Sequence, residues 1–245
     1  MKIIKHLLIL LLAITISSCQ FTEEITIKND GSGEYKLNMD LSAMMGAMKS
    51  MGQNDSLKKQ PEKKDTLIYM KDIINKNKDS IAKLPKKERG ALEALKDLKM
   101  HIKLDEAKGI MQYDFIFDFN TVSELKDIQS KIKKAQNIQD NKSDKKEEIE
   151  NHDVTYSYTK TSFSRKVTLR DLSPEDQQSY DKKMQESKMF LSGSTYRIIY
   201  HFPKSIKEIS YKGAQFSEDH KTITIQVAMD TLINNPKLLD FKVDF

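Results

Sequence analysis

Alternation of apolar and polar residues with a period of two is the feature that most constrains the fold of this 245-residue chain. Ile25 and Ile27 alternate with polar neighbours, the run stops at the turn sequence Asn-Asp-Gly-Ser-Gly over 29–33, and Tyr35 and Leu37 resume the pattern. Such alternation is typical of half-buried antiparallel strands, and glycine-rich turns join them into hairpins. Hairpins are therefore predicted over three stretches: 21–40, 100–119 and 154–169.

Shorter alternating runs occupy the last fifth of the chain. They lie at 196–202, 206–209, 223–227 and 239–245. Together with the hairpins they predict eight or nine strands. This number favours one strongly curved antiparallel sheet, or a sheet closed on itself.

Helical spacing appears between the predicted hairpins. Asp65 is a candidate cap for a helix that runs to about Leu84, and Pro85 fits the first position of another helix, which presents Leu92 and Leu95. Further helix starts are predicted at the capping box 121–124, at Ser173-Pro174, and in the methionine-containing stretch 41–51. The fold class is therefore α+β, with a curved antiparallel sheet packed against several inserted helices.

The domain organisation follows from two polar stretches and the amino-terminal segment. Residues 52–64 and 139–153 contain few apolar side chains, and we interpret both as flexible surface loops within a single α+β domain over 19–245. Residues 1–18 have a basic start, an apolar run over 7–14 and small residues at the end. This composition predicts a secretory signal peptide rather than a membrane-spanning helix, which needs roughly 20 apolar residues.

Cys19 is the single cysteine of the chain and directly follows the predicted signal peptide. The sequence Ile-Ser-Ser-Cys over 16–19 resembles the bacterial lipobox, which places the thiol for diacylglycerol transfer. A diacylglycerol thioether at Cys19, usually with a further acyl chain such as palmitate on its amino group, would anchor the protein in a membrane. The alternative is an ordinary signal peptide that carries a cysteine.

The residues after Cys19 bear on location. Gln20 replaces the aspartate that marks inner-membrane retention in many Gram-negative lipoproteins, and the pair Glu23 and Glu24 resembles the surface-export signals of Bacteroidetes lipoproteins. We therefore expect a lipid-anchored protein of the cell envelope, with the outer membrane favoured and surface exposure left open. The alternative is that Glu23 and Glu24 lie on the solvent face of the first strand.

Three stretches together resemble the LppM-like family of bacterial lipoproteins: the run 24–33 close behind Cys19, the segment 200–206 in which a strand meets a proline, and the strand 221–227. The resemblance implies an α+β domain whose curved sheet and helices enclose an apolar cavity of the kind that binds lipids, and it implies no catalytic residues. The long insertion over 41–98 departs from the family's compact form.

Residue patterns for catalysis and metal binding are missing from the sequence. The histidines at 101, 152, 201 and 220 have no metal-binding spacing, Ser192-Gly193 lacks the flanks of a nucleophile elbow, and no glycine-rich phosphate loop occurs. The net charge is only +5, with 41 basic and 36 acidic residues, which does not predict nucleic-acid binding. We expect a non-enzymatic protein with no metal, no cofactor and no nucleic-acid partner.

The candidate ligand-binding residues are methionines and aromatic residues. Methionine is flexible and polarizable, so a methionine stripe can line a site for acyl chains. The candidates are Met44, Met45, Met48, Phe115 and Phe117. The alternative is that the methionine helix only packs on the sheet.

Two functions remain open from the sequence. The first is an envelope lipoprotein that holds a lipid or other apolar ligand between sheet and helices. The second is a scaffold or protein-interaction lipoprotein of the envelope with a fully packed core.

Overall fold

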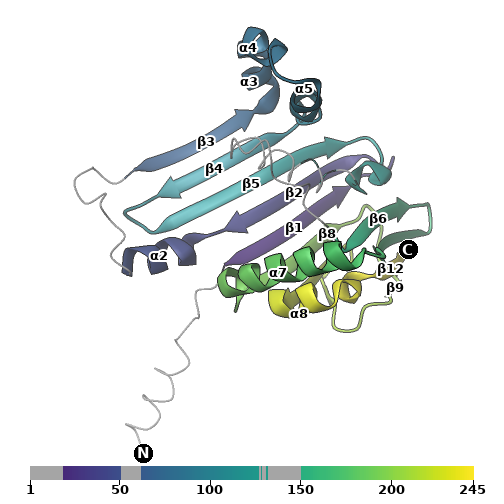
Figure 1. Cartoon of the computed structure of the whole chain (residues 1–245). Helices are drawn as coiled ribbons and strands as arrows, with labels where there is room; N and C mark the ends of the chain where they lie inside the picture. The colour runs from purple at the N-terminus through teal and green to yellow at the C-terminus, as the bar shows by residue number, and fades with distance from the viewer. Residues whose placement is uncertain (1–18, 51–61, 127, 129–130, 132–149) are drawn as a thin grey trace, which may run out of the picture.

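The computed structural model describes residues 19–50, 62–126, 128, 131 and 150–245. The predicted signal peptide, most of the predicted loop 52–64 and all but the end of the predicted loop 139–153 lie outside these residues. The described chain is α+β, as predicted, and contains strands in two sheets together with helices (Figure 1). None of its helices is both long enough and apolar enough to cross a membrane.

The larger sheet has eight strands in the order β10-β11-β8-β1-β2-β5-β4-β3. The predicted hairpins β1–β2 and β4–β5 are confirmed, and both are antiparallel. β1 lies at the centre of the sheet and pairs in parallel with β8, which lies about 170 residues further along the chain. The sheet is open, because β10 and β3 form its two edges. Its strands are β1 (Gln20–Ile27), β2 (Gly33–Asp40), β3 (Lys63–Tyr69), β4 (Lys99–Asp105), β5 (Ile110–Phe119), β8 (Thr195–His201), β10 (Gln215–Phe216) and β11 (Thr222–Ala228).

A second, four-stranded sheet has the order β6-β7-β12-β9. It contains the third predicted hairpin, and sequence reasoning did not separate it from the first sheet. Phe163 and Val243 of this sheet are fully buried and belong to the same core cluster as Ile25 and Tyr200 of the larger sheet, so the two sheets pack through their apolar faces. Its strands are β6 (His152–Tyr158), β7 (Ser162–Leu169), β9 (Glu208–Ile209) and β12 (Phe241–Asp244).

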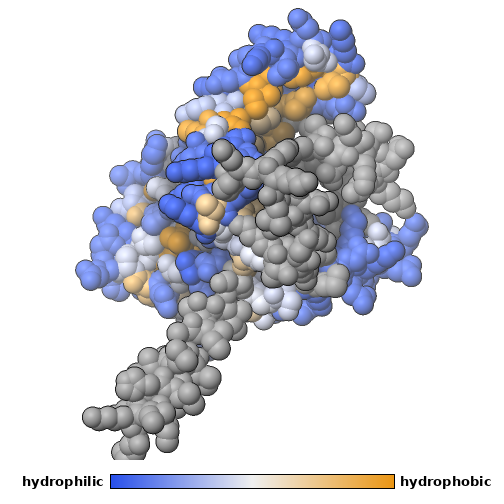
Figure 2. Space-filling view, turned by 90° about the vertical axis from the view of Figure 1, so that its left-hand side faces the viewer, coloured by the Kyte–Doolittle hydropathy of each residue, from blue (hydrophilic) through white to orange (hydrophobic). Residues whose placement is uncertain are grey.

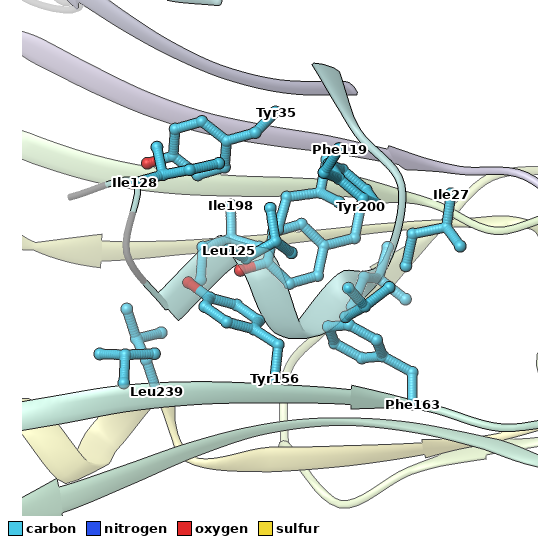
Figure 3. Packing of buried hydrophobic residues seen from close by; sticks show 14 of the residues in the cluster. Ile27, Tyr35, Phe119, Leu125, Ile128, Tyr156, Phe163, Ile198, Tyr200 and Leu239 are labelled. Carbon is cyan, nitrogen blue, oxygen red and sulfur yellow. The ribbon is translucent and has the colours of Figure 1, made fainter. Parts of the chain in front are cut away.

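The hydrophobic core lies between the two sheets. Ile25 and Tyr200 of the larger sheet face Phe163 and Phe241 of the smaller one, and all four are buried. Ring centroids of Phe163 and Tyr200 are 5.5 Å apart in an edge-to-face arrangement, which is favourable for aromatic pairs. Figure 3 shows that a helical turn carrying Leu125 fills the space between the sheets. The part of the core that lies between the sheets is therefore filled by side chains.

The helices connect the strands and in part cover them. The predicted capping box is present, with Thr121 and Glu124 at a short 3-10 helix, η1 (Val122–Glu124). The Ser173 hydroxyl caps α7 by accepting from the Asp176 backbone amide, as the Ser-Pro sequence predicted. The remaining helices are α2 (Ser42–Ser50), α3 (Met70–Lys76), α4 (Lys78–Ala82), α5 (Lys86–Glu93), α7 (Pro174–Leu191), α8 (Met229–Asn234) and the 3-10 helix η2 (Pro236–Leu239).

The helix predicted from Asp65 to Leu84 is wrong in its first part. Lys63–Tyr69 forms the edge strand β3, which pairs with β4, and helical structure begins only at Met70. The reason is that the edge strand is largely exposed on both faces, so its sequence carries no apolar alternation to reveal it. Asp65 does not cap a helix but contacts His101 on β4.

Candidate functional site

A pocket of about 350 Å³ lies at the carboxyl end of β5, between that strand end and the segment that joins α5 to β4. Its apolar wall comes from the strand β5, the turn after η1 and the residue before β4. These elements contribute Phe117, Phe119, Ile128 and Leu98, all of which are nearly inaccessible to solvent. Ala94 and Tyr69 complete the apolar part of the lining.

The rim of the pocket is charged. Lys71, Lys96, Lys99 and Lys131 contribute ammonium groups, and Asp97, Asp118 and Glu124 contribute carboxylates. Lys99 is already paired, since its Nζ lies 2.7 Å from Oδ2 of Asp118, and this hydrogen bond raises the pKa of the lysine. Lys71 lies over the Tyr69 ring, with its Nζ 5.5 Å from the ring centroid. Among the described residues, no carboxylate forms an ion pair with Lys71 or Lys131.

The predicted ligand-binding residues do not form one site. Phe117 lines the pocket, and Phe115, two residues earlier on the same face of β5, is buried between Leu37 and Met100 on the neighbouring strands. Met44 and Met45 belong to α2, which contacts the opposite end of β5.

The two methionines also differ in exposure. Met44 is exposed and Met45 is half-buried, and neither lines the pocket. The side chain of Met48 lies outside the description. The helix α2 contacts the start of β5 (Figure 1), whereas Phe117 lies near the end of that strand.

Cys19 lies directly at the start of β1. Its carbonyl oxygen accepts a hydrogen bond of 3.1 Å from the backbone amide of Thr195, the first residue of β8. The thiol is free and the residue is half-buried. No flexible spacer separates the predicted lipidation residue from the sheet.

A polar cluster between the two sheets was missed by sequence reasoning. Glu23 on β1 is fully buried, so the alternative interpretation, that it lies on the solvent face of the first strand, is wrong. Its carboxylate accepts hydrogen bonds from the hydroxyls of Tyr156, Tyr196 and Tyr200, the first at 3.2 Å. Arg165 lies 3.9 Å away through its Nε and donates from Nη1 to the Leu239 carbonyl. Figure 3 shows Tyr156 and Tyr200 pointing toward one another from the two sheets.

Burial governs the titration of these tyrosines. Loss of water raises the pKa of Tyr196 and Tyr200 well above the ordinary value, and the negative charge of Glu23 raises it further. The hydroxyls therefore stay protonated and act as donors to the carboxylate. Because Glu23 has no contact with solvent, this cluster holds the sheets together and offers no entry to a substrate.

His101 and His201 are half-exposed and lie beside carboxylates. His101 contacts Asp65 at 2.6 Å and Asp114 at 3.2 Å, and His201 contacts Glu24 at 3.1 Å. Hydrogen bonds that the ring donates to the carboxylates of Asp65 and Asp114 raise the pKa of His101. Among the described residues, no group of three histidine, cysteine or acidic side chains could hold a metal ion.

Comparison with solved structures gives one match. The folded domain of LppM from Mycobacterium tuberculosis, solved by NMR, resembles this chain with a TM-score of 0.41 and 7% sequence identity. The similarity covers 92% of this chain and 88% of that domain. No protein-family model and no curated protein matches the sequence. Membership of the LppM-like family therefore stays a prediction.

Proposed function

We propose that this chain is a non-enzymatic, lipid-anchored lipoprotein of the cell envelope that binds a small amphiphilic anion in the pocket beside β5. Diacylglycerol at Cys19 holds it in a membrane, with the outer membrane favoured. The observation that carries the ligand-binding part is the pocket itself, with its apolar wall and its lysine-containing rim.

The size and lining of the pocket support this proposal. Its volume of about 350 Å³ falls at the lower end of the range of roughly 300–1,000 Å³ typical of small-molecule sites. Phe117 and Phe119 offer an apolar surface to a short acyl or ring portion of a ligand. Lys71 and Lys131 lie at the rim, where an acidic group would remain near water and contact both ammonium groups.

The position of Cys19 supports the anchoring part. Its carbonyl accepts a hydrogen bond from the first residue of β8, and β1 begins at the next residue, Gln20. Acyl chains on the sulfur of Cys19 would therefore hold the domain directly at the membrane surface. Such closeness suits a protein that exchanges amphiphilic molecules with a membrane.

Filling the pocket tests the ligand-binding part. Ala94→Phe adds bulk to the lining without removing a core side chain, and Ala107→Phe adds the same bulk in the exposed turn between β4 and β5. Native mass spectrometry of the purified lipidated protein, incubated with a medium-chain fatty acid, should show bound ligand in the wild type and in Ala107→Phe but not in Ala94→Phe. Equal binding in all three proteins, or none in the wild type, would count against the proposal.

A second function is favoured by a different observation. Leu67, Tyr69 and Ile73 are exposed large apolar residues that follow one another on β3 and α3. Figure 2 shows hydrophobic surface gathered over this upper part of the molecule. Together with the packed core between the sheets, this patch supports the scaffold alternative, in which an envelope protein docks there.

Photo-crosslinking in whole cells tests this alternative. A crosslinking amino acid at Leu67 should capture one discrete partner, whereas the same group at the exposed Leu169 of β7 should not. Identical products from both positions, or none from Leu67, would remove the patch from consideration.

A further inference from the structure

Several strands of the larger sheet begin or end at the same end of the sheet as Cys19. Gln20 pairs with Asp40 at the end of β2 and with Thr195 at the start of β8, and Asp40 pairs in turn with Gln112 near the start of β5. We call this end of the sheet the anchor edge. It is formed by the first residues of β1, β5 and β8 and the last residues of β2, and it is distinct from the edge strands β10 and β3. Whatever is attached to Cys19 therefore emerges beside these strand ends.

The helix α2 is fixed to the anchor edge by several hydrogen bonds. The Asp40 carboxylate accepts from the Ser42 backbone amide at 3.0 Å and from the Gln112 side chain at 2.9 Å. At the same place, the Met111 amide donates to the Ser42 hydroxyl at 3.0 Å, and the Leu41 amide donates to the Met111 carbonyl at 2.8 Å. The amino end of α2 is thus held by side chains and backbone of both β2 and β5.

The sequence of α2 is apolar. Ser-Ala-Met-Met-Gly-Ala-Met-Lys-Ser contains three methionines, two alanines and no acidic residue, and Lys49 is its single charged residue. Met44 is 36% exposed, and Gly46 next to Met45 is exposed as well. Met44 thus presents a flexible apolar side chain to solvent beside the anchor edge, as a residue that enters a membrane interface must.

The helix α2 lies close to Cys19, and this closeness indicates what covers the helix. The strand β2 lies between β1 and β5, so β1 and β5 are two interstrand spacings apart, which is about 10 Å. A bilayer that contains the acyl chains of Cys19 therefore lies next to α2.

On this basis, which rests on the anchoring part of the proposed function, we propose that α2 docks on the lipid bilayer and inserts Met44 into it. The helix is then a second membrane contact, and it fixes the orientation of the domain relative to the membrane. With one anchor the domain would rotate about Cys19, whereas two contacts hold the anchor edge against the bilayer.

The charges around the anchor edge are mixed, which indicates that apolar contact drives the docking. Lys63 and Lys108 lie near the ends of β3 and β4, but Glu62 and Glu106 lie beside them and are linked by a hydrogen bond from the Glu62 backbone amide. Docking of α2 is therefore expected on zwitterionic phosphatidylcholine as well as on membranes with anionic lipid.

A single introduced cysteine can report the docking. Cys19 is the chain's one cysteine and its thiol is blocked in the lipidated protein, so Met44→Cys provides the single site for a polarity-sensitive fluorophore. The same label at Leu67→Cys reports an exposed apolar position on β3, and at Ala107→Cys an exposed position in the turn at the end of β4. The lipidated proteins are reconstituted in phosphatidylcholine vesicles with and without spin-labelled lipid, and flotation measures the anchoring of each protein.

We expect all three proteins to float with the vesicles. The label at Met44→Cys should shift to shorter emission wavelength and be quenched by spin-labelled lipid about threefold more than at Leu67→Cys, because interfacial helices lie roughly 5–10 Å into the headgroup region. If the proteins float but Met44→Cys is quenched no more than Leu67→Cys, the docking of α2 is wrong while the anchor stands.

Two other outcomes also decide the matter. A wavelength shift at Met44→Cys without quenching by lipid would mean that protein, such as a second copy of the chain, covers α2, and it would overturn the proposal. Failure of the wild-type protein to float would overturn the anchor itself, and the docking with it.

Discussion

Tyr156 on β6 donates a hydrogen bond of 3.2 Å to Glu23 on β1, and this bond crosses from the smaller sheet to the larger one. The carboxylate is fully buried, so the tyrosine hydroxyls around it and the nearby Arg165 take the place of water as its partners. A buried charge that loses its solvation is tolerated only when hydrogen bonds and an opposite charge replace the water. The hydrogen bond from Tyr156 and the adjacent Arg165 therefore link the smaller sheet to Glu23 of the larger sheet across the core.

Replacement of Glu23 should destabilise the protein strongly. Glu23→Ala leaves Arg165 buried without its carboxylate, and we expect a loss of about 3–5 kcal/mol in the free energy of unfolding. Glu24→Ala is the matched control, because Glu24 is on the opposite face and pairs with Lys36 at 3.2 Å near solvent, where such pairs contribute about 0–1 kcal/mol. Urea denaturation measures both. Similar losses for the two variants would contradict the role assigned to the buried cluster.

Replacement of Gly33 and of Gly46 by alanine should change the stability of the protein in opposite directions. A Cβ on Gly33 would lie 1.9 Å from the Thr26 carbonyl oxygen and 2.6 Å from Phe119, so Gly33→Ala should cost about 1–3 kcal/mol or more through strain. A Cβ on Gly46 in α2 meets no atom within 4 Å, and Gly46→Ala should stabilise by about 0.5–1 kcal/mol. Thermal denaturation gives both signs, and a stabilising Gly33→Ala would refute the packing described for that turn.

The stability of edge strand β3 should depend on pH through His101. Hydrogen bonds with Asp65 and Asp114 raise the pKa of His101 in the folded protein above its ordinary value of 6.5. The stabilisation is therefore complete below pH 6.5 and is lost as the pH rises through the raised pKa. The pKa of Asp65 is lowered from 3.8 by its hydrogen bond with His101, so its share is present above that value and is lost in stronger acid.

Hydrogen exchange of the β3 amides measures this dependence. Wild-type β3 should be better protected than β3 of His101→Gln at pH 5.5, and the difference should shrink at pH 9. His201→Gln, which alters a histidine on β8, serves as the control and should leave the protection of β3 unchanged. A difference between wild type and His101→Gln that does not vary with pH would exclude titration of His101 as its cause.

Replacement of Cys19 should release the protein from the membrane. Cys19→Ser removes the thiol to which diacylglycerol would be attached, and with it the anchoring by two or more acyl chains. Fractionation of cells that express the variant should show the protein in the soluble fraction, with the wild type in the membrane fraction. A variant that stays fully in the membrane fraction would contradict lipidation at Cys19.

Much of the strand content could be predicted because it is local. The hairpins β1–β2, β4–β5 and β6–β7 each combine alternation with a turn of few residues, and both signals lie in one short stretch. The division into two sheets could not be predicted in this way. It depends on the parallel pairing of β1 with β8 and on β12 joining β7, contacts between residues far apart in the chain.

The buried carboxylate could have been found from its place in the pattern. Glu23 has the same parity along β1 as Ile25 and Ile27, and a strand places alternate residues on the same face. The adjacent Glu24 makes the two residues resemble an acidic pair. Neighbours on a strand point in opposite directions, however, so Glu23 and Glu24 do not share a face. Its partners come from β6, β7 and β8, and no local signal in the sequence joins them.

The candidate site was predicted only in part. Phe117 lies in the pocket, but Lys71 at the rim closely follows β3, whose place in the sheet the sequence concealed. Met44 and Met45 were predicted to bind a ligand because they are flexible and apolar. In the structure they lie on α2, near the end of the sheet that carries Cys19, and not near Phe117.

The central position of β1 has a mechanical consequence. A pull on acyl chains at Cys19 would load this strand along its length, while hydrogen bonds to β2 on one side and β8 on the other resist sliding. In such a shear geometry the bonds share the load and must break together, whereas an edge strand would peel away one bond at a time. The tether thus enters the fold where it best withstands force.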